Sequence, residues 1–178
     1  MALNFKTLNF IRINKILITN QFDIWVLQFN MFRGATHLSM DAKYRLAVPL
    51  KHRHVLETQG AGSLILTAHP HRCLLLYPQP LWAPIEAKIN GLSSFNPQTS
   101  AYQRMMVGQA EDISLDSAGR LLVSSVLRAF ANLDKDIMFV GQGSHFELWD
   151  LAAWNKQLET LMGADVVEMP TELQGFSL

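Results

Sequence analysis

Hydrophobic positions along the chain occur in short runs separated by polar turns, a pattern typical of a β-rich protein with short helices. Four brief apolar segments predict strands, at 63–67, 73–77, 137–140 and 145–149. Each pair of segments is followed by a stretch with the apolar spacing of a helix, which contains Trp82 in one case and Trp154 in the other. The pattern therefore predicts two β-hairpins, each followed by a helix.

A similar arrangement precedes each hairpin. We expect a strand, a short turn opened by an aspartate that accepts backbone N–H bonds, a brief second strand and a short helix. Pro49 suits the first position of one such helix, and Ser124 suits the N-cap of the other. The predicted strands are 32–39, 45–48, 111–115 and 120–123, and the predicted helices are 50–58, 125–132 and one that starts near Pro97.

These two arrangements form an internal repeat. Asp41, Arg45, Leu46, Val48 and Arg53 recur 75 positions later as Asp116, Arg120, Leu121, Val123 and Arg128. Leu76, Tyr77, Trp82 and Ile89 recur 72 positions later as Leu148, Trp149, Trp154 and Leu161, which favours a core role for these aromatic residues. A repeat of about 50 residues buries too little apolar surface to be stable alone. An α+β, β-rich fold in which both repeats share one core is therefore predicted.

Composition narrows the class of protein. Hydrophobic residues make up 49% of the 178 residues, which is enough for a core. No apolar run approaches the roughly 20 residues that cross a bilayer, so no membrane partner is expected. The single cysteine, Cys73, cannot form a disulfide within the chain, which favours a reducing, cytoplasmic compartment.

Charge is distributed unevenly along the chain. Residues 31–103 contain seven Lys and Arg against three acids, a net charge of +4, whereas residues 104–178 contain five against eleven, a net charge of −6. Within residues 33–54, five basic residues and three histidines accompany a single acid, Asp41. A partner of opposite charge, such as DNA, is expected to bind this region.

Sequence signatures of catalysis and of metal binding are weak. The stretch HPHRC at 69–73 brings two histidines and a cysteine together, but a tetrahedral site usually needs four ligands and the sequence offers no second cluster. It contains no phosphate-binding loop, nucleophile elbow or paired-carboxylate signature. We therefore expect no enzymatic activity, no metal and no cofactor.

From residue 31 onward the chain closely resembles the MraZ family of bacterial transcription regulators, which are built from two AbrB-like (SpoVT-AbrB) units. The resemblance is carried by MFRGATHLSMDAKYRLAVP at 31–49, CLLLYP at 73–78, LSSFNP at 92–97, DSAGRLLV at 116–123 and VGQGSHFELWD at 140–150. It implies two tandem swapped-hairpin units in a pseudo-twofold, β-barrel-like domain with peripheral helices. It also implies a nucleoid-associated, ring-shaped homo-oligomer that binds repeated promoter sites in double-stranded DNA and represses its own division and cell-wall gene cluster.

The repeat and the resemblance together predict the organisation of the chain. We expect a non-family N-terminal extension at 1–30 that precedes a start at Met31, a first AbrB-like unit at 31–81 and a helical connector at 82–109. A second AbrB-like unit is expected at 110–153, followed by a C-terminal helix and acidic tail at 154–178.

The resemblance also assigns roles to residues of the two turns. In the family pattern these turns read D-x-K-x-R and D-x-A-G-R, and the basic residues of the first contact DNA, which places Lys43 and Arg45 in that role. Weaker candidates for DNA phosphate contacts are Arg33, Lys51 and Arg53. The expected structural residues are Asp41, Asp116, Gly119 and Arg120, with Arg120 paired to Asp116 or bonded to its turn.

One position departs from the family pattern. Tyr44 stands in the first turn where most members have glycine, whereas Gly119 is kept in the second. If the position requires a positive φ, tyrosine costs on the order of 1 kcal/mol of strain, so a reshaped first turn is expected.

Two alternative interpretations remain open. The basic turn can be an ordinary solvated hairpin tip. The chain can also be a protein-binding module akin to the AbrB-like antitoxins, which would be distinguished by a long tail that wraps around a partner. Only about fifteen residues follow the last predicted helix.

Overall fold

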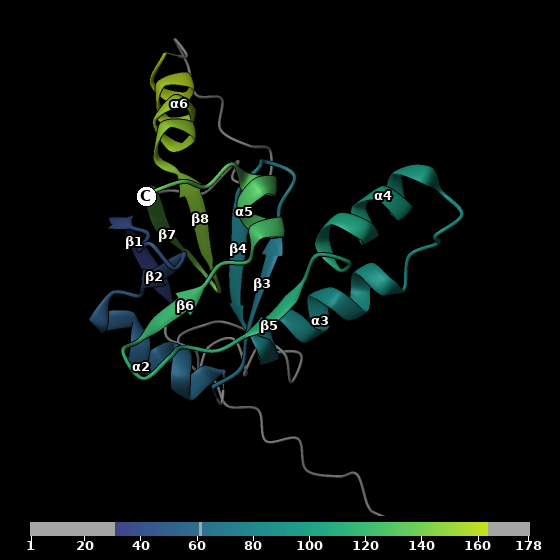
Figure 1. Cartoon of the computed structure of the whole chain (residues 1–178). Helices are drawn as coiled ribbons and strands as arrows, with labels where there is room; N and C mark the ends of the chain where they lie inside the picture. The colour runs from purple at the N-terminus through teal and green to yellow at the C-terminus, as the bar shows by residue number, and fades with distance from the viewer. Residues whose placement is uncertain (1–30, 61, 164–178) are drawn as a thin grey trace, which may run out of the picture. The chain divides into compact units, whose positions relative to one another are not determined.

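The structure is a computed structural model, and it describes residues 31–60 and 62–163. Both repeats fall within one compact unit of the chain. The first repeat contains β1 (Phe32–Ser39), β2 (Arg45–Ala47), α2 (Leu50–Gln59), β3 (Leu64–Ala68), β4 (Leu74–Pro78) and α3 (Gln79–Asn90) (Figure 1). After α4 (Pro97–Met106), the second repeat contains β5 (Glu111–Ile113), β6 (Arg120–Leu122), α5 (Ser125–Ala131), β7 (Asp136–Gly143), β8 (Phe146–Asp150) and α6 (Leu151–Met162).

The predicted strands and helices are confirmed, with ends displaced by a few residues. Ser124 caps α5 as expected, because its side chain accepts a hydrogen bond from the Leu127 N–H. Pro49 does not take the first helical position; its ψ of 135° is extended, so it lies at the N-cap and α2 begins one residue later, at Leu50. The 1–30 extension and the acidic tail from residue 164 lie outside the described residues.

A six-stranded antiparallel sheet in the order β1-β7-β8-β4-β3-β5 forms the centre of the fold. In the two repeats β1 is equivalent to β5, β3 to β7 and β4 to β8. Exchanging each strand for its equivalent reverses the strand order of the sheet without otherwise changing it. The two repeats are therefore related by a pseudo-twofold axis between β4 and β8. Each repeat gives its first strand to the other, because β1 pairs with β7 and β5 pairs with β3. This exchange explains why both repeats share one core.

The second, smaller sheet joins the two repeats at their turns. β2 and β6 pair antiparallel, with Leu46 opposite Leu121. Both leucine side chains are fully buried in a core that lies between this small sheet with α2 and α5 and the inner face of the large sheet. That inner face is formed by alternate residues of the strands, as the pleat requires. Leu66, Leu76 and Leu148 are among them.

The prediction of a barrel-like domain is not confirmed, because the large sheet is open. Closure would require β1 to pair with β5. The pseudo-twofold axis instead puts these strands at opposite edges, and among the described residues they do not pair with each other. The confirmed statement is a mixed α+β fold with a six-stranded antiparallel sheet.

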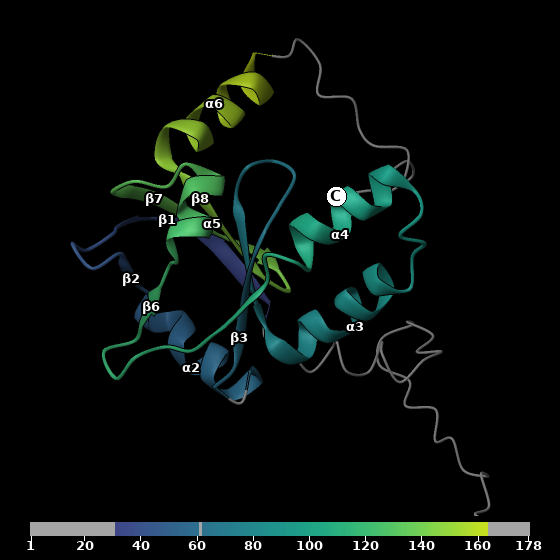
Figure 2. The ribbon, with the colours of Figure 1, turned by 45° about the vertical axis from the view of Figure 1, so that its right-hand side comes forward.

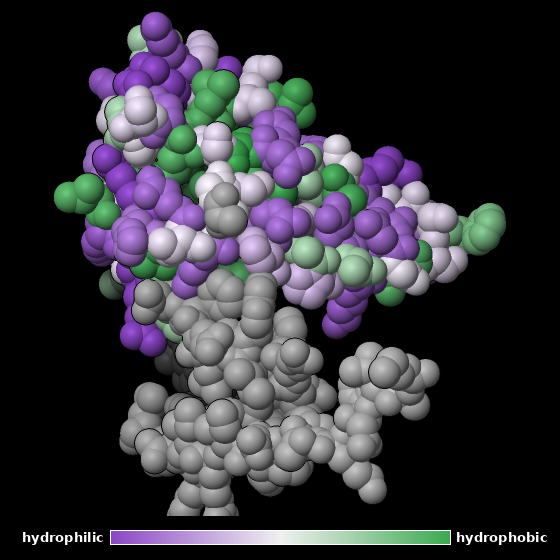
Figure 3. All heavy atoms as spheres, turned by 90° about the horizontal axis from the view of Figure 1, so that it is seen from below, coloured by the Kyte–Doolittle hydropathy of each residue, from purple (hydrophilic) through white to green (hydrophobic). Residues whose placement is uncertain are grey.

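Helices α3 and α4 lie against the outer face of the large sheet, whereas α6 continues from β8 and buries none of its residues. α3 and α4 contact β3 and β4, and α6 contacts β7 and β8 (Figure 2). The predicted core role of the aromatic residues is confirmed for Trp82, Tyr77 and Trp149, which are buried, while Trp154 is half-buried against Trp149. On the face seen from below, hydrophobic side chains lie scattered among hydrophilic ones (Figure 3).

Candidate nucleic-acid interface

The first turn is built around Asp41. One carboxylate oxygen, Oδ1, accepts backbone N–H bonds from Lys43 at 2.8 Å and from Arg45 at 3.0 Å. The other oxygen, Oδ2, accepts from Nε of Arg45 at 2.9 Å. The Tyr44 N–H closes the turn on the Asp41 carbonyl at 2.9 Å. The predicted role of this aspartate, to accept backbone N–H groups, is thereby seen in the structure.

The second turn repeats these bonds around Asp116. Its Oδ1 accepts from the N–H groups of Ala118 and Arg120, both at 2.9 Å, and its Oδ2 accepts from Nε of Arg120 at 2.8 Å. Each turn is tied to the strand of the other repeat, because Val48 N–H donates to the Gly119 carbonyl and Val123 N–H donates to the Tyr44 carbonyl. The two turns therefore lie side by side about the pseudo-twofold axis.

Two arginines and two aspartates form an ion-pair quartet between the turns. Arg45 pairs with Asp41 at 2.7 Å and Arg120 with Asp116 at 2.8 Å. Each arginine also reaches the aspartate of the other turn at 3.9 Å. Hydrogen bonds from Arg45 and Arg120 lower the pKa of Asp41 and of Asp116 to about 2, and the bond to Asp116 raises the pKa of Arg120. The four side chains are about one-quarter to one-third exposed, so the quartet is accessible from solvent.

A second pair of arginines crosses from each repeat to the turn of the other. Nε of Arg53 donates to the Val48 carbonyl at 2.7 Å, and Nε of Arg128 donates to the Val123 carbonyl at 3.2 Å. Arg53 lies directly against Gly119, where a Cβ would stand 2.5 Å from its Cζ. Arg128 lies over the ring of Tyr44, with Cζ 3.3 Å from the ring centre.

The expected reshaping of the first turn is wrong. Tyr44 has φ 60° and Gly119 has φ 73°, and the two turns make the same backbone bonds. The left-handed conformation costs tyrosine about 1–2 kcal/mol. The contact with Arg128 offsets part of this cost, because a cation over an aromatic face at a partly exposed site contributes about 0.5–1 kcal/mol.

Five basic residues thus lie in or against the two turns that hold the carboxylates of Asp41 and Asp116, namely Lys43, Arg45, Arg53, Arg120 and Arg128. Lys43 is exposed at the first turn, where the second turn has Ala118. Of the other candidates, Lys51 is exposed on α2 with its ammonium beside Gly34, and Arg33 is exposed on β1 opposite Gln142. They belong to the α2 and β1 side of the domain and take no part in the quartet.

Sequence reasoning missed Arg128 as a neighbour of the first turn. It treated Arg120 and Arg128 as members of an acidic half, because it counted charge along the chain. The repeat itself carried the signal, since Arg128 is the equivalent of Arg53 and α5 is the equivalent of α2. The structure brings charges from both halves to one surface.

A metal site is not found among the described residues, which contain no group of three or more potential ligands that could hold an ion. Sγ of Cys73 lies 3.7 Å from Nδ1 of His69. Burial raises the pKa of the Cys73 thiol to about 12, so the thiol stays protonated at neutral pH. No helix in residues 31–60 and 62–163 is long and apolar enough to span a membrane.

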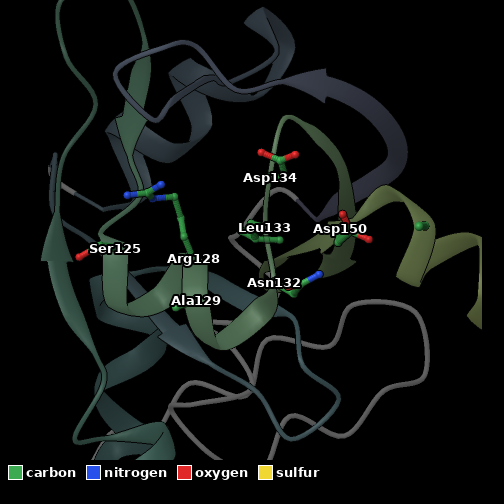
Figure 4. A pocket seen from close by; sticks show the side chains of 8 residues that line it. Ser125, Arg128, Ala129, Asn132, Leu133, Asp134 and Asp150 are labelled. Carbon is green, nitrogen blue, oxygen red and sulfur yellow. The ribbon is translucent and has the colours of Figure 1, made fainter.

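An open cavity of about 710 Å³ lies between α5 and the start of α6 (Figure 4). Arg128, Asp134 and Asp150 are among its lining residues, but Figure 4 shows Arg128 directed away from both acids. The Asp150 carboxylate caps α6, where it accepts from the Ala153 N–H at 3.0 Å. The Asp150 charge is therefore already engaged in the fold, and the Arg128 charge is directed elsewhere.

Comparison with known proteins places this arrangement in a family. A family model described as "MraZ protein, putative antitoxin-like" matches the chain twice, over residues 31–105 and 106–176. The chain belongs to the MraZ family. Three relatives are each called "Transcriptional regulator MraZ" and match over 148 residues, 83% of this chain and their full length. They are 66% identical in Methylobacillus flagellatus, 55% in Nitrosospira multiformis and 49% in Nitrosomonas eutropha.

Proposed function

We propose that this chain is a DNA-binding transcription regulator whose paired turns contact double-stranded DNA. The observation that supports this most directly is the gathering of five basic residues at two turns that hold only two carboxylates, with Lys43, one of the five, exposed. Antiparallel strands joined at a tip can enter a DNA groove, and cations there contact phosphates or base edges. The shared name of the relatives, transcriptional regulator, agrees with this role. Regulation, not catalysis, is the proposed activity.

Within this proposal, Lys43 and Arg45 lie closest to the DNA bases, and an arginine can bridge O6 and N7 of guanine. Arg53, Arg33 and Lys51 hold phosphates on either side. Asp41 aligns Arg45 through two bonds, so the guanidinium is already oriented before DNA binds. Asp116, Gly119 and Arg120 shape the neighbouring turn.

We further propose that several copies act together as a ring-shaped homo-oligomer of AbrB-like units at repeated promoter sites, in the cytoplasm at the nucleoid. A single turn with a few phosphate contacts binds DNA only at about 10⁻⁴ to 10⁻⁶ M. Several turns aligned with several sites raise avidity by about 10² to 10⁴ without new contacts. The proposed target is the promoter of the chain's own division and cell-wall gene cluster, and the proposed effect is repression.

Arg45→Ala tests the DNA contact, and Arg120→Ala is its matched control, because each removes the same bonds from an equivalent aspartate. The full chain and both variants are titrated against their own upstream promoter DNA and a scrambled duplex, and the oligomer mass is recorded. A bidentate base contact is worth about 1–3 kcal/mol, so its loss from every turn abolishes promoter binding.

We expect Arg45→Ala to lose promoter binding while it keeps its mass, and Arg120→Ala to keep both. Unchanged promoter affinity in Arg45→Ala would refute the contact. If both variants lose binding and stability equally, Arg45 acts only by holding its turn.

The family description favours one second candidate, an antitoxin-like module that binds a protein partner. The wild-type titration separates the two. Lack of preference for the promoter over the scrambled duplex, with the oligomer intact, would favour the protein partner.

A further inference from the structure

The arginines near the turns differ in how much of their hydrogen-bonding capacity is used within the chain. Arg45 and Arg120 direct their guanidinium groups at the two aspartates of the quartet. Arg128 uses only Nε, on the Val123 carbonyl. Within residues 31–60 and 62–163, its two terminal nitrogens make no hydrogen bond and no carboxylate lies within ion-pair distance. Figure 4 shows the side chain directed away from Asp134 and Asp150. Its charge is therefore available to a partner.

Tyr44 determines what Arg128 lies against. In the second turn, the equivalent Arg53 rests on the bare backbone of Gly119. In the first turn, Arg128 rests on the aromatic ring of Tyr44, a residue that is 49% exposed and follows the exposed Lys43. Stacking leaves the edges of a guanidinium free, and its terminal N–H groups match the oxygens of a phosphate.

We infer that Arg128 is a DNA phosphate contact of the first turn and that Tyr44 positions it. This inference rests on the proposed DNA-binding function and extends it to a residue of the acidic half of the chain. Anchored at Nε and stacked on one face, Arg128 presents its two terminal nitrogens at the first turn. The first turn therefore carries a phosphate contact that the other repeat supplies.

The salt dependence of DNA binding tests this inference, because each phosphate contact adds about 0.9 to the slope of log affinity against log salt concentration. The full chain, Arg128→Ala, Tyr44→Phe and Tyr44→Gly are titrated against promoter and scrambled duplexes at several salt concentrations. Arg104→Ala is the matched control. Arg104 is an exposed arginine bonded to Ser100 on α4, away from β2 and β6 in both ribbon views (Figures 1 and 2).

We expect Arg128→Ala to make the slope less steep by about 0.9 for each chain that contacts the duplex. When the salt concentration rises from about 50 to 200 mM, the variant should then lose about 3.5-fold less affinity per contacting chain than the wild type loses. Affinity should fall for both duplexes, because a phosphate contact carries no sequence information. Tyr44→Phe keeps the ring and should match the wild type. Tyr44→Gly removes the ring and should lower the slope, and Arg104→Ala should leave it unchanged.

An unchanged slope in Arg128→Ala would overturn the inference while leaving the proposed function standing, provided that the wild type binds its promoter. Equal slopes in Tyr44→Phe and Tyr44→Gly would overturn the positioning role of the ring. If Arg128→Ala does not fold, the two Tyr44 variants decide, since they leave the bond between Arg128 and Val123 in place. A wild type with no salt-dependent DNA binding would overturn both proposals together.

Discussion

Replacing Gly119 by alanine tests how the two turns are held together. Gly119 has φ 73°, and the left-handed conformation costs an alanine about 1–2 kcal/mol. The new Cβ would stand 2.5 Å from Cδ and Cζ of Arg53, so that side chain must move and break its 2.7 Å bond to the Val48 carbonyl. A hydrogen bond from a charged donor contributes about 1.5–3 kcal/mol. The expected loss in the free energy of unfolding is therefore about 2.5–5 kcal/mol.

Gly62→Ala is the matched control. Gly62 has φ 83°, but a Cβ there meets nothing within 4 Å, so only the conformational cost remains. Unfolding by urea is followed by tryptophan fluorescence at one fixed protein concentration, because association shifts the apparent stability. We expect Gly119→Ala to lose more than Gly62→Ala, and the excess to vanish when Arg53 is also replaced by alanine. Equal losses in the two glycine variants would refute the reasoning.

Two further predictions concern the quartet and the core. The pKa of Asp41 and Asp116 is lowered to about 2 from the ordinary 3.8, so the stability that these carboxylates contribute is present above about pH 4 and is lost as the pH falls towards 2. Urea unfolding across this range should show a smaller fall for Asp116→Asn than for the wild type; an equal fall would contradict this. Leu46→Ala and Leu121→Ala each remove most of a fully buried side chain and leave a cavity. Each should lower the free energy of unfolding by about 2–5 kcal/mol in the same assay. A cost below about 1 kcal/mol for either variant would show that the small sheet is not part of the core.

The sequence by itself determined the local elements, the repeat and the chemistry within each turn. The local elements and the turn chemistry depend on residues close together in the sequence. Asp41 accepts from N–H groups two and four positions ahead, and Ser124 caps the helix that it precedes. The family could be read from the same local motifs.

Only the tertiary structure decided how the repeats combine. The exchange of β1 and β5, the open sheet and the position of Arg128 over Tyr44 all join residues far apart in the chain. Local hydrophobic pattern does not specify which of several similar strands pair, and charge counted along the sequence does not show which charges meet in space. For that reason the sequence separated a basic half from an acidic half, whereas the fold places arginines of both halves around one axis.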